Sequence, residues 1–195
     1  MNKIAFRTGL VLIALGMIVL AIAQVRSRSA TADVRYGPVP AFTLTDTDGR
    51  NIRQQDLAGK VWVADFIFTS CAGTCPLMTA QMRKLQDLLP HEIGLVSFSV
   101  DPKRDTPEVL TRYARQFQAD TQRWLFLTGD RQTIYNVTVN GFKLALDDTQ
   151  GSEQEPITHS SRFALIDKNL NIRSYYSGTD EADFQKLVQD AKSLL

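Results

Sequence analysis

The chain has 195 residues, 44% of them hydrophobic and 22% charged, and its formal net charge is +1. This apolar content with balanced charge excludes a disordered chain, and two cysteines are too few for a disulfide scaffold. Residues 1–35 carry a formal charge of +4 and residues 36–195 one of −3. An acidic body without a basic stripe also argues against a nucleic acid as partner.

The first predicted element is an apolar run over residues 9–25, with basic residues on both sides. The run is just long enough to span a bilayer, so we predict a single uncleaved transmembrane helix with residues 1–8 in the cytoplasm. The Ala30-Thr31-Ala32 sequence leaves a cleaved signal peptide as the alternative. In both cases residues 26–38 form a tether, and residues 39–195 form a domain on the periplasmic side of the inner membrane or at the cell exterior.

The exported part alternates between strand and helix patterns. A short hairpin is expected around the turn at residues 46–49, and the apolar run at residues 61–68 is typical of a strand covered on both faces. Pro76 indicates the first turn of a helix, which places Cys75 at its N-cap. Further strands are expected at residues 93–100, 124–127, 163–166 and 172–176, and further helices at 107–117, 131–139 and 184–195. This order predicts a mixed α/β sheet flanked by helices.

The two cysteines, Cys71 and Cys75, are three residues apart on the loop between the predicted buried strand and the next helix. Thiolates are favoured at a helix N-terminus, because the macrodipole and free N–H groups stabilise negative charge. Both sulfurs can face one point, which suits either a redox pair or two soft ligands for copper(I). Met78 and Met82 follow at helical spacing, and we favour core packing over metal binding for them.

The two histidines differ in position. His91 lies in a connection expected at the opposite end of the sheet, so we predict a surface residue. His159 directly precedes a strand; if that strand is antiparallel to the cysteine strand, His159 comes within reach of both sulfurs. His159 is therefore the candidate third ligand.

Residues 36–193 resemble the Sco/SenC family, on three motifs in order: FTSCAGTCP at 68–76, VDPKRDTP at 100–107 and THSSRFALID at 158–167. The resemblance implies a thioredoxin-like fold and a membrane-anchored copper protein that assists assembly of the CuA centre of cytochrome c oxidase. It also implies that Cys71, Cys75 and His159 are the copper ligands. Ala72 and Gly73 depart from the family, which usually has proline and often an acidic residue there.

Asp65 precedes Cys71 by six residues, as an aspartate does in the strand of the thioredoxins. There the resemblance implies a buried carboxyl group that takes part in proton transfer, so Asp65 is a candidate proton acceptor. A carboxylate that is hydrogen-bonded to a neighbouring strand is the alternative. Asp105 and Thr106 are expected to cap the helix that follows them.

Two functions need this cysteine pair. The first is a non-enzymatic copper chaperone that binds copper(I), or copper(II) with a further weak ligand, and serves the CuA-carrying oxidase subunit or another copper chaperone. The second is an anchored thiol-disulfide reductase, with Cys71 and Cys75 as the redox pair, which acts on cysteines of a copper-site partner. A plain interaction domain is the third class.

Overall fold

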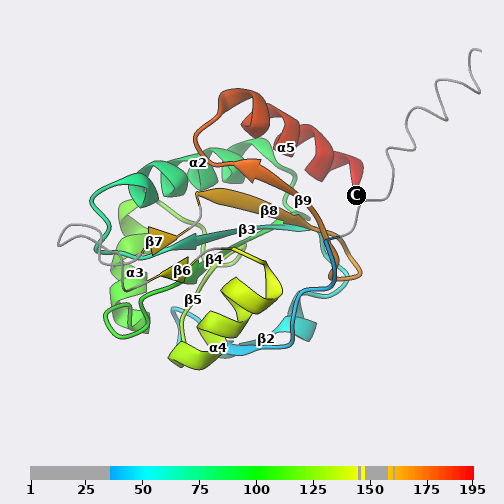
Figure 1. Ribbon diagram of the computed structural model, residues 1–195. Coiled ribbons are helices and arrows are strands. Elements are labelled where there is room, and N and C mark those ends of the chain that lie inside the picture. Colours follow the sequence, from blue (N-terminus) through cyan, green and yellow to red (C-terminus); the bar gives the residue numbers. More distant parts are fainter. Residues whose placement is uncertain (1–35, 145, 148–157, 160) are drawn as a thin grey trace, which may run out of the picture. The chain divides into compact units, whose positions relative to one another are not determined.

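The central feature of the fold is a five-stranded sheet with the strand order β5-β4-β3-β8-β9 (Figure 1). The computed structural model describes residues 36–144, 146–147, 158–159 and 161–195. They belong to a compact unit that begins at Arg35. The strands are β3 (Trp62–Ile67), β4 (Gly94–Ser99), β5 (Trp124–Leu127), β8 (Arg162–Ile166) and β9 (Ile172–Ser177). β3, β4 and β5 run parallel, whereas β8 is antiparallel to β3 and to β9. The predicted mixed sheet is therefore confirmed.

The predicted transmembrane helix at residues 9–25 and most of the predicted tether lie outside the described residues. Within the described part of the chain, no helix is long and apolar enough to cross a membrane. Residues 36–38, at the end of the predicted tether, hydrogen-bond along β9: the Tyr36 N–H donates to the Ile172 carbonyl at 2.9 Å, and the Ile172 N–H donates to the Gly37 carbonyl at 2.9 Å.

Helices cover both faces of the sheet. Figure 1 shows α2 and α5 on one side of it and α4 on the other. The helices are α2 (Thr74–Leu88), α3 (Pro107–Gln116), α4 (Arg131–Tyr135) and α5 (Glu181–Ser193), with a 3-10 turn η1 (Gln54–Leu57) and a π-helix η2 (Asn136–Gly141). The helix predicted at residues 131–139 is thus α4 followed by a π-helical turn. Two short strands, β6 (Leu146–Asp147) and β7 (Thr158–His159), form a separate pair that was not predicted.

Side chains alternate between the two faces of β3 because successive residues of a strand point in opposite directions. On one face Phe66 stacks on Phe98 at 5.1 Å between ring centroids and meets Phe142 edge-on at 5.0 Å. On the other face Asp65 pairs in register with Ser97 of β4. All six residues of β3 are buried, which explains the continuous apolar run seen in its sequence.

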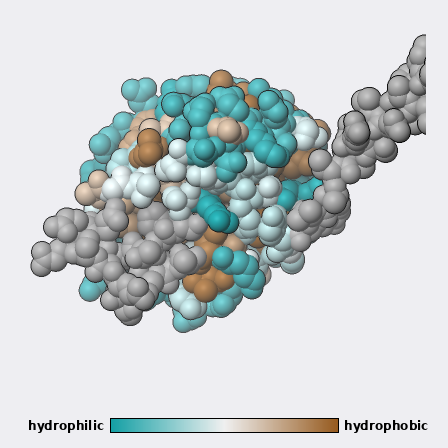
Figure 2. All heavy atoms as spheres, turned by 45° about the horizontal axis from the view of Figure 1, so that its top comes forward, coloured by the Kyte–Doolittle hydropathy of each residue, from teal (hydrophilic) through white to brown (hydrophobic). Residues whose placement is uncertain are grey.

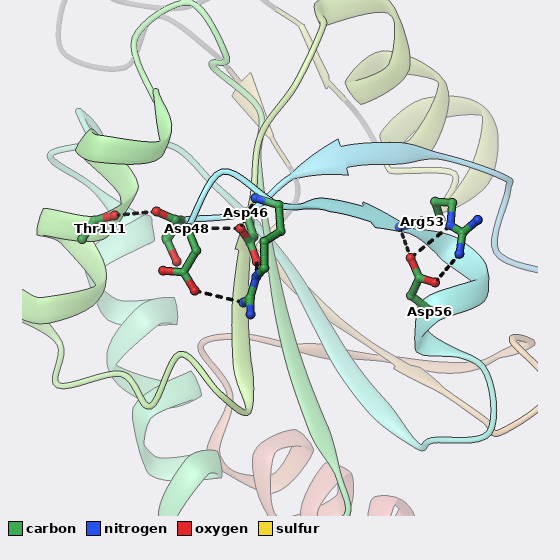
Figure 3. Close-up of polar contacts among 7 residues, drawn as sticks. Asp46, Asp48, Arg53, Asp56 and Thr111 are labelled. Carbon is green, nitrogen blue, oxygen red and sulfur yellow. Dashed lines mark hydrogen bonds and ion pairs between the residues drawn. The ribbon is translucent and has the colours of Figure 1, made fainter.

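The predicted hairpin is formed by β1 (Thr43–Thr45) and β2 (Asn51–Arg53). Its turn is closed by the buried Asp46 carboxylate, which accepts from Arg50 Nε at 2.7 Å and from the Arg50 N–H at 2.9 Å (Figure 3). The Thr111 hydroxyl of α3 donates to the Thr47 carbonyl at 3.1 Å, so the turn is also held against α3. At the other end of the hairpin Arg53 pairs with Asp56 at 2.9 Å.

The surface over α5 is mainly hydrophilic, with hydrophobic colour confined to separate spots (Figure 2). Large apolar side chains that are exposed in the described residues include Leu77 and Leu88, on the solvent side of α2. Isolated exposed leucines are ordinary on a soluble domain and do not by themselves indicate a binding surface.

Candidate metal centre

Both cysteines lie beyond the carboxyl end of β3, Cys71 on the loop that leads into α2 and Cys75 in the first turn of that helix. They are free thiols and both are buried, Cys71 with 7% of its surface exposed and Cys75 with none. The Cys71 N–H donates to the Phe68 carbonyl at 3.3 Å, which turns the loop back on itself. The loop therefore presents the Cys71 side chain closer to solvent than that of Cys75.

The helix starts earlier than predicted. α2 begins at Thr74 with Gly73 as its N-cap, so Cys75 is the second helical residue and Pro76 the third. The prediction of Cys75 at the N-cap was wrong, although Pro76 does lie in the first turn. Gly73 has φ −101° and ψ −111°, a backbone conformation that a short, flexible loop reaches and that the sequence alone does not reveal.

Burial outweighs the helix dipole at Cys75. Burial is the largest cause and raises the pKa of the Cys75 thiol. A hydrogen bond from the Phe68 backbone lowers this pKa. The interaction with the Cys71 thiol, through a hydrogen bond and its charge, raises it. The expected thiolate stabilisation is therefore reversed at Cys75, whose thiol stays protonated until a metal or an oxidation step displaces the proton.

Asp65 lies fully buried beneath the cysteine loop, and its two oxygens have different surroundings. Oδ1 accepts a hydrogen bond of 2.6 Å from the Ser97 hydroxyl, which itself accepts from Trp124 Nε1 at 2.9 Å. Oδ2 has no hydrogen-bond partner among the described atoms. Burial raises the pKa of Asp65 to about 7, while the Ser97 hydrogen bond opposes this rise. The interpretation of Asp65 as a carboxyl group bonded to a neighbouring strand is thus confirmed for one oxygen. The role of proton acceptor stays a prediction, which the raised pKa supports.

His159 is in β7, where its backbone pairs with Leu146 of β6; its side chain lies outside the described atoms. β8 is antiparallel to β3, with Ala64 opposite Ala164, so the start of β8 meets the end of β3 from which the cysteine loop leaves. The strand arrangement on which the His159 prediction depended is therefore present. Among the described side chains, no group of three or more His, Cys, Asp or Glu residues is arranged to hold a metal ion.

His91 is exposed and precedes β4. Since β3 and β4 are parallel, the start of β4 and the end of β3 lie at opposite ends of the sheet. His91 is therefore a surface residue far from the cysteine loop, as expected. Met78 and Met82 are fully buried in the core, as expected for packing residues.

Asp105 connects a second loop to the cysteine loop. Its buried carboxylate accepts from the Thr69 N–H at 3.1 Å, from the Thr69 hydroxyl at 2.5 Å and from the Ser99 hydroxyl at 2.6 Å. The expected helix cap is Thr106 alone, whose hydroxyl accepts from the Val109 N–H at 3.4 Å. Asp105 does not cap the helix, because its side chain points to the carboxyl ends of β3 and β4, which meet at one edge of the sheet.

Tyr113 is a part of the site that the sequence did not indicate. It is buried on α3, and its hydroxyl lies 2.8 Å from Thr79 Oγ1, which donates to the Cys75 carbonyl at 2.9 Å. Thr79 has one hydroxyl proton and gives it to Cys75, so the Tyr113 hydroxyl is the donor to Thr79. Burial, the largest cause, and the charges of Asp65 and both cysteines raise the pKa of Tyr113. The sequence predicted a helix over residues 107–117 but assigned no role to Tyr113.

The sequence of this chain is similar to those of a known family. Residues 32–195 match the sequence profile of the family SCO1/SenC. The SCO1 protein homolog of Bacillus subtilis is 36% identical over 159 residues, which are 80% of this chain and 81% of that protein.

Two solved structures have the same fold. The first is BsSco, a member of the Sco family of cytochrome c oxidase assembly proteins, and a disulfide switch was identified in it. It matches with a TM-score of 0.73 and 32% identity, over 83% of this chain and 96% of that one. ScoI of Bradyrhizobium japonicum with copper bound matches with a TM-score of 0.69 and 22% identity, over 81% of this chain and 99% of that one. The expected thioredoxin-like fold is therefore confirmed.

Proposed function

Since this chain belongs to the SCO1/SenC family, we propose that it is a copper-binding protein of cytochrome c oxidase assembly. The observation that carries the proposal is the pair of buried, free thiols where the loop after β3 enters α2, Cys71 and Cys75. Soft thiolates select copper(I), and the donor set on this loop therefore fits that ion. The metal is the cargo of the protein and not a permanent structural part of it.

Cys71, Cys75 and His159 are the proposed ligands. The start of β8 lies at the end of β3, and His159 is three residues before the first residue of that strand. An imidazole added to two thiolates gives a three-coordinate site for copper(I), or a site for copper(II) with a further weak ligand. The match of the three sequence motifs to the family supports this assignment.

The partner in the proposal is the oxidase subunit that carries the CuA site, or another copper chaperone. Support comes from the description of BsSco as a cytochrome c oxidase assembly protein. The apolar run at residues 9–25 would anchor the domain to the inner membrane with residues 39–195 outside the cytoplasm. Such a location brings the cysteine loop to the side on which an exported copper site is assembled.

Redox chemistry would gate copper loading, because only the reduced pair can bind the metal. In exchange with a disulfide of a partner, the dithiol becomes the Cys71–Cys75 disulfide, and its two electrons and two protons pass to the partner, whose disulfide becomes two thiols. Only three residues separate the two cysteines, which allows this step. The raised pKa of the buried Asp65 supports the role proposed for it, acceptance of a proton from Cys75. The same pair supports the second candidate function, a thiol-disulfide reductase in which the more exposed Cys71 attacks the partner's disulfide.

Copper titration of the full chain in detergent, with both thiols reduced, tests the proposal. We expect one copper ion per chain in the unaltered protein and in His91→Ala, which removes the exposed histidine at the far end of the sheet. His159→Ala should bind copper(II) more weakly, and Cys71→Ser should lose most of the binding of both copper ions. Undiminished copper(II) affinity in His159→Ala would remove that ligand from the site.

A disulfide-reduction assay distinguishes the second candidate. A reductase turns over disulfide substrates, and its activity survives His159→Ala but not Cys71→Ser. A chaperone shows copper transfer that depends on all three residues and no comparable turnover.

A further inference from the structure

Gly178 lies where three segments of the site meet. It follows β9, and its N–H donates to the Ser161 carbonyl at 2.8 Å. Ser161 is two residues after His159, and Met78, the third neighbour, is one helical turn after Cys75 on α2. Gly178 thus touches both of the segments that carry the proposed ligands.

The missing side chain of Gly178 allows this close approach. A Cβ at this position would lie 3.0 Å from the Ser161 carbonyl oxygen, 3.1 Å from Met78 Cγ and 3.3 Å from Met78 Cε. Gly178 is not one of the glycines with a positive φ, so its backbone conformation is open to alanine. The requirement for glycine is therefore steric. Met78 is fully buried and Ser161 directly precedes β8, the strand that pairs with β3, so an added methyl group would push these two segments apart.

We propose that Gly178 is a positioning residue that sets the distance of His159 from the cysteine pair, and that it thereby determines the preference of the site for copper(II) over copper(I). This inference rests on the proposed function, in which His159 is the third ligand. Two thiolates are sufficient to hold the soft copper(I) ion, whereas copper(II) depends more on the imidazole. A displacement of the segment that carries His159 therefore weakens copper(II) binding more than copper(I) binding.

The test uses Gly178→Ala in the full chain, with Gly94→Ala as the matched control. A Cβ at Gly94 meets Trp62 Cβ at 3.5 Å, an ordinary contact at the other end of the sheet. In Gly178→Ala we expect the copper(II) affinity to fall about 10-fold to 100-fold, the range typical of residues that orient metal ligands. Its thiolate-to-copper(II) absorption band should shift, and its copper(I) affinity should change much less. Gly94→Ala should match the unaltered chain in all three measurements.

A double-variant cycle separates this inference from the proposed function. In the His159→Ala background there is no imidazole to displace, so Gly178→Ala should cause no further loss of copper(II) affinity. If His159→Ala alone has no effect, the proposed ligand set fails. If His159→Ala lowers the affinity and Gly178→Ala does not, or if Gly178→Ala causes an equal loss in both backgrounds, the role of Gly178 is overturned.

A rescue variant keeps the test valid if Gly178→Ala alone does not fold. Met78→Ala removes the two atoms that the new methyl group would meet on α2. The combined variant Gly178→Ala/Met78→Ala, with its fold checked by circular dichroism, should recover part of the copper(II) affinity and the original absorption band. A folded combined variant without any recovery would contradict the steric argument.

Discussion

The Asp105 carboxylate accepts hydrogen bonds from both the backbone N–H and the hydroxyl of Thr69, 36 residues earlier in the chain. Thr69 begins the cysteine loop, and Asp105 ends the loop between β4 and α3. The same carboxylate also accepts from the Ser99 hydroxyl at the end of β4. A single buried side chain therefore fixes the start of the cysteine loop to two neighbouring elements.

Removal of the Asp105 carboxylate should lower the stability of the protein. In Asp105→Ala the buried Ser99 donor and the partly buried Thr69 donors are left without their acceptor, so we expect the free energy of unfolding to fall by roughly 2–4 kcal/mol. Urea denaturation measures the loss. Asp48→Ala is the control, because Asp48 is half exposed and pairs with the exposed Arg50 at 3.1 Å, and it should change little. Equal losses of stability in the two variants would contradict the claim that the hydrogen bonds of Asp105 stabilise the cysteine loop.

The Tyr113–Thr79 pair should show energetic coupling. Tyr113→Phe removes the donor to Thr79 and keeps the ring that packs on Phe126 at 6.4 Å, so a loss of roughly 0.5–1.5 kcal/mol is expected. In a cycle with Thr79→Val the two losses should be less than additive, because they share one hydrogen bond.

Tyr175→Phe provides the matched control for that cycle. Its hydroxyl also donates to a backbone carbonyl, that of Phe142 at 2.6 Å, but it has no contact with Thr79 in the described structure. Its loss should therefore add to that of Thr79→Val. Additive losses for Tyr113 as well would show that the 2.8 Å contact contributes nothing to stability.

Much of the scaffold could be predicted because its causes are local. The buried run of β3 and the helical spacing after Pro76 follow from the chain's own periodicity. The antiparallel pairing of β8 with β9 follows from two strands joined by a short turn. These features needed no knowledge of distant contacts. The antiparallel placement of β8 beside β3, on which the position of His159 depends, is a long-range pairing, and the sequence offered it only as a condition.

The features that escaped prediction depend on distant partners. Tyr113 acts on Thr79, 34 residues away, and a periodic apolar pattern does not distinguish a tyrosine that donates a hydrogen bond from one that only packs. Asp105 was assigned to a helix cap because aspartate before Thr-Pro suits a cap, whereas its partners Thr69 and Ser99 meet it only in the folded sheet. The start of α2 at Thr74 has a local cause instead, the backbone angles of Gly73, which the flexibility of glycine leaves open in the sequence.

Gly141 should also resist substitution, for a reason unrelated to the copper site. At the end of the π-helix, a Cβ at Gly141 would lie 2.3 Å from Pro40 Cγ and 2.5 Å from Pro40 Cδ, so the chain must move. We expect Gly141→Ala to lower the free energy of unfolding by roughly 1–3 kcal/mol, the cost typical of overpacking. Thermal unfolding beside Gly94→Ala measures this cost. A melting temperature equal to that of Gly94→Ala would show that Pro40 moves aside freely.

Asp65 should make the stability of the protein depend on pH. Its pKa is raised by burial to about 7 in the folded chain and is near 3.9 in an unfolded one. Between these two values the folded state binds more protons than the unfolded state, so the free energy of unfolding falls as the pH rises from about 4 to about 7. Above this range the cost is fully present and no longer changes.

The groups near Asp65 do not titrate between about pH 4 and about pH 7. Ser97 of β4 does not ionise, and Cys75 of α2 and Tyr113 of α3 both have pKa values raised by burial, so they stay neutral through this range. Asp65→Asn keeps the shape and the Ser97 contact and cannot ionise. The free energy of unfolding of Asp65→Asn relative to the unaltered chain should therefore increase by on the order of 2–4 kcal/mol between pH 4.5 and pH 8. Urea denaturation across this range measures the difference, and parallel pH profiles would mean that Asp65 is not the group that titrates near neutrality.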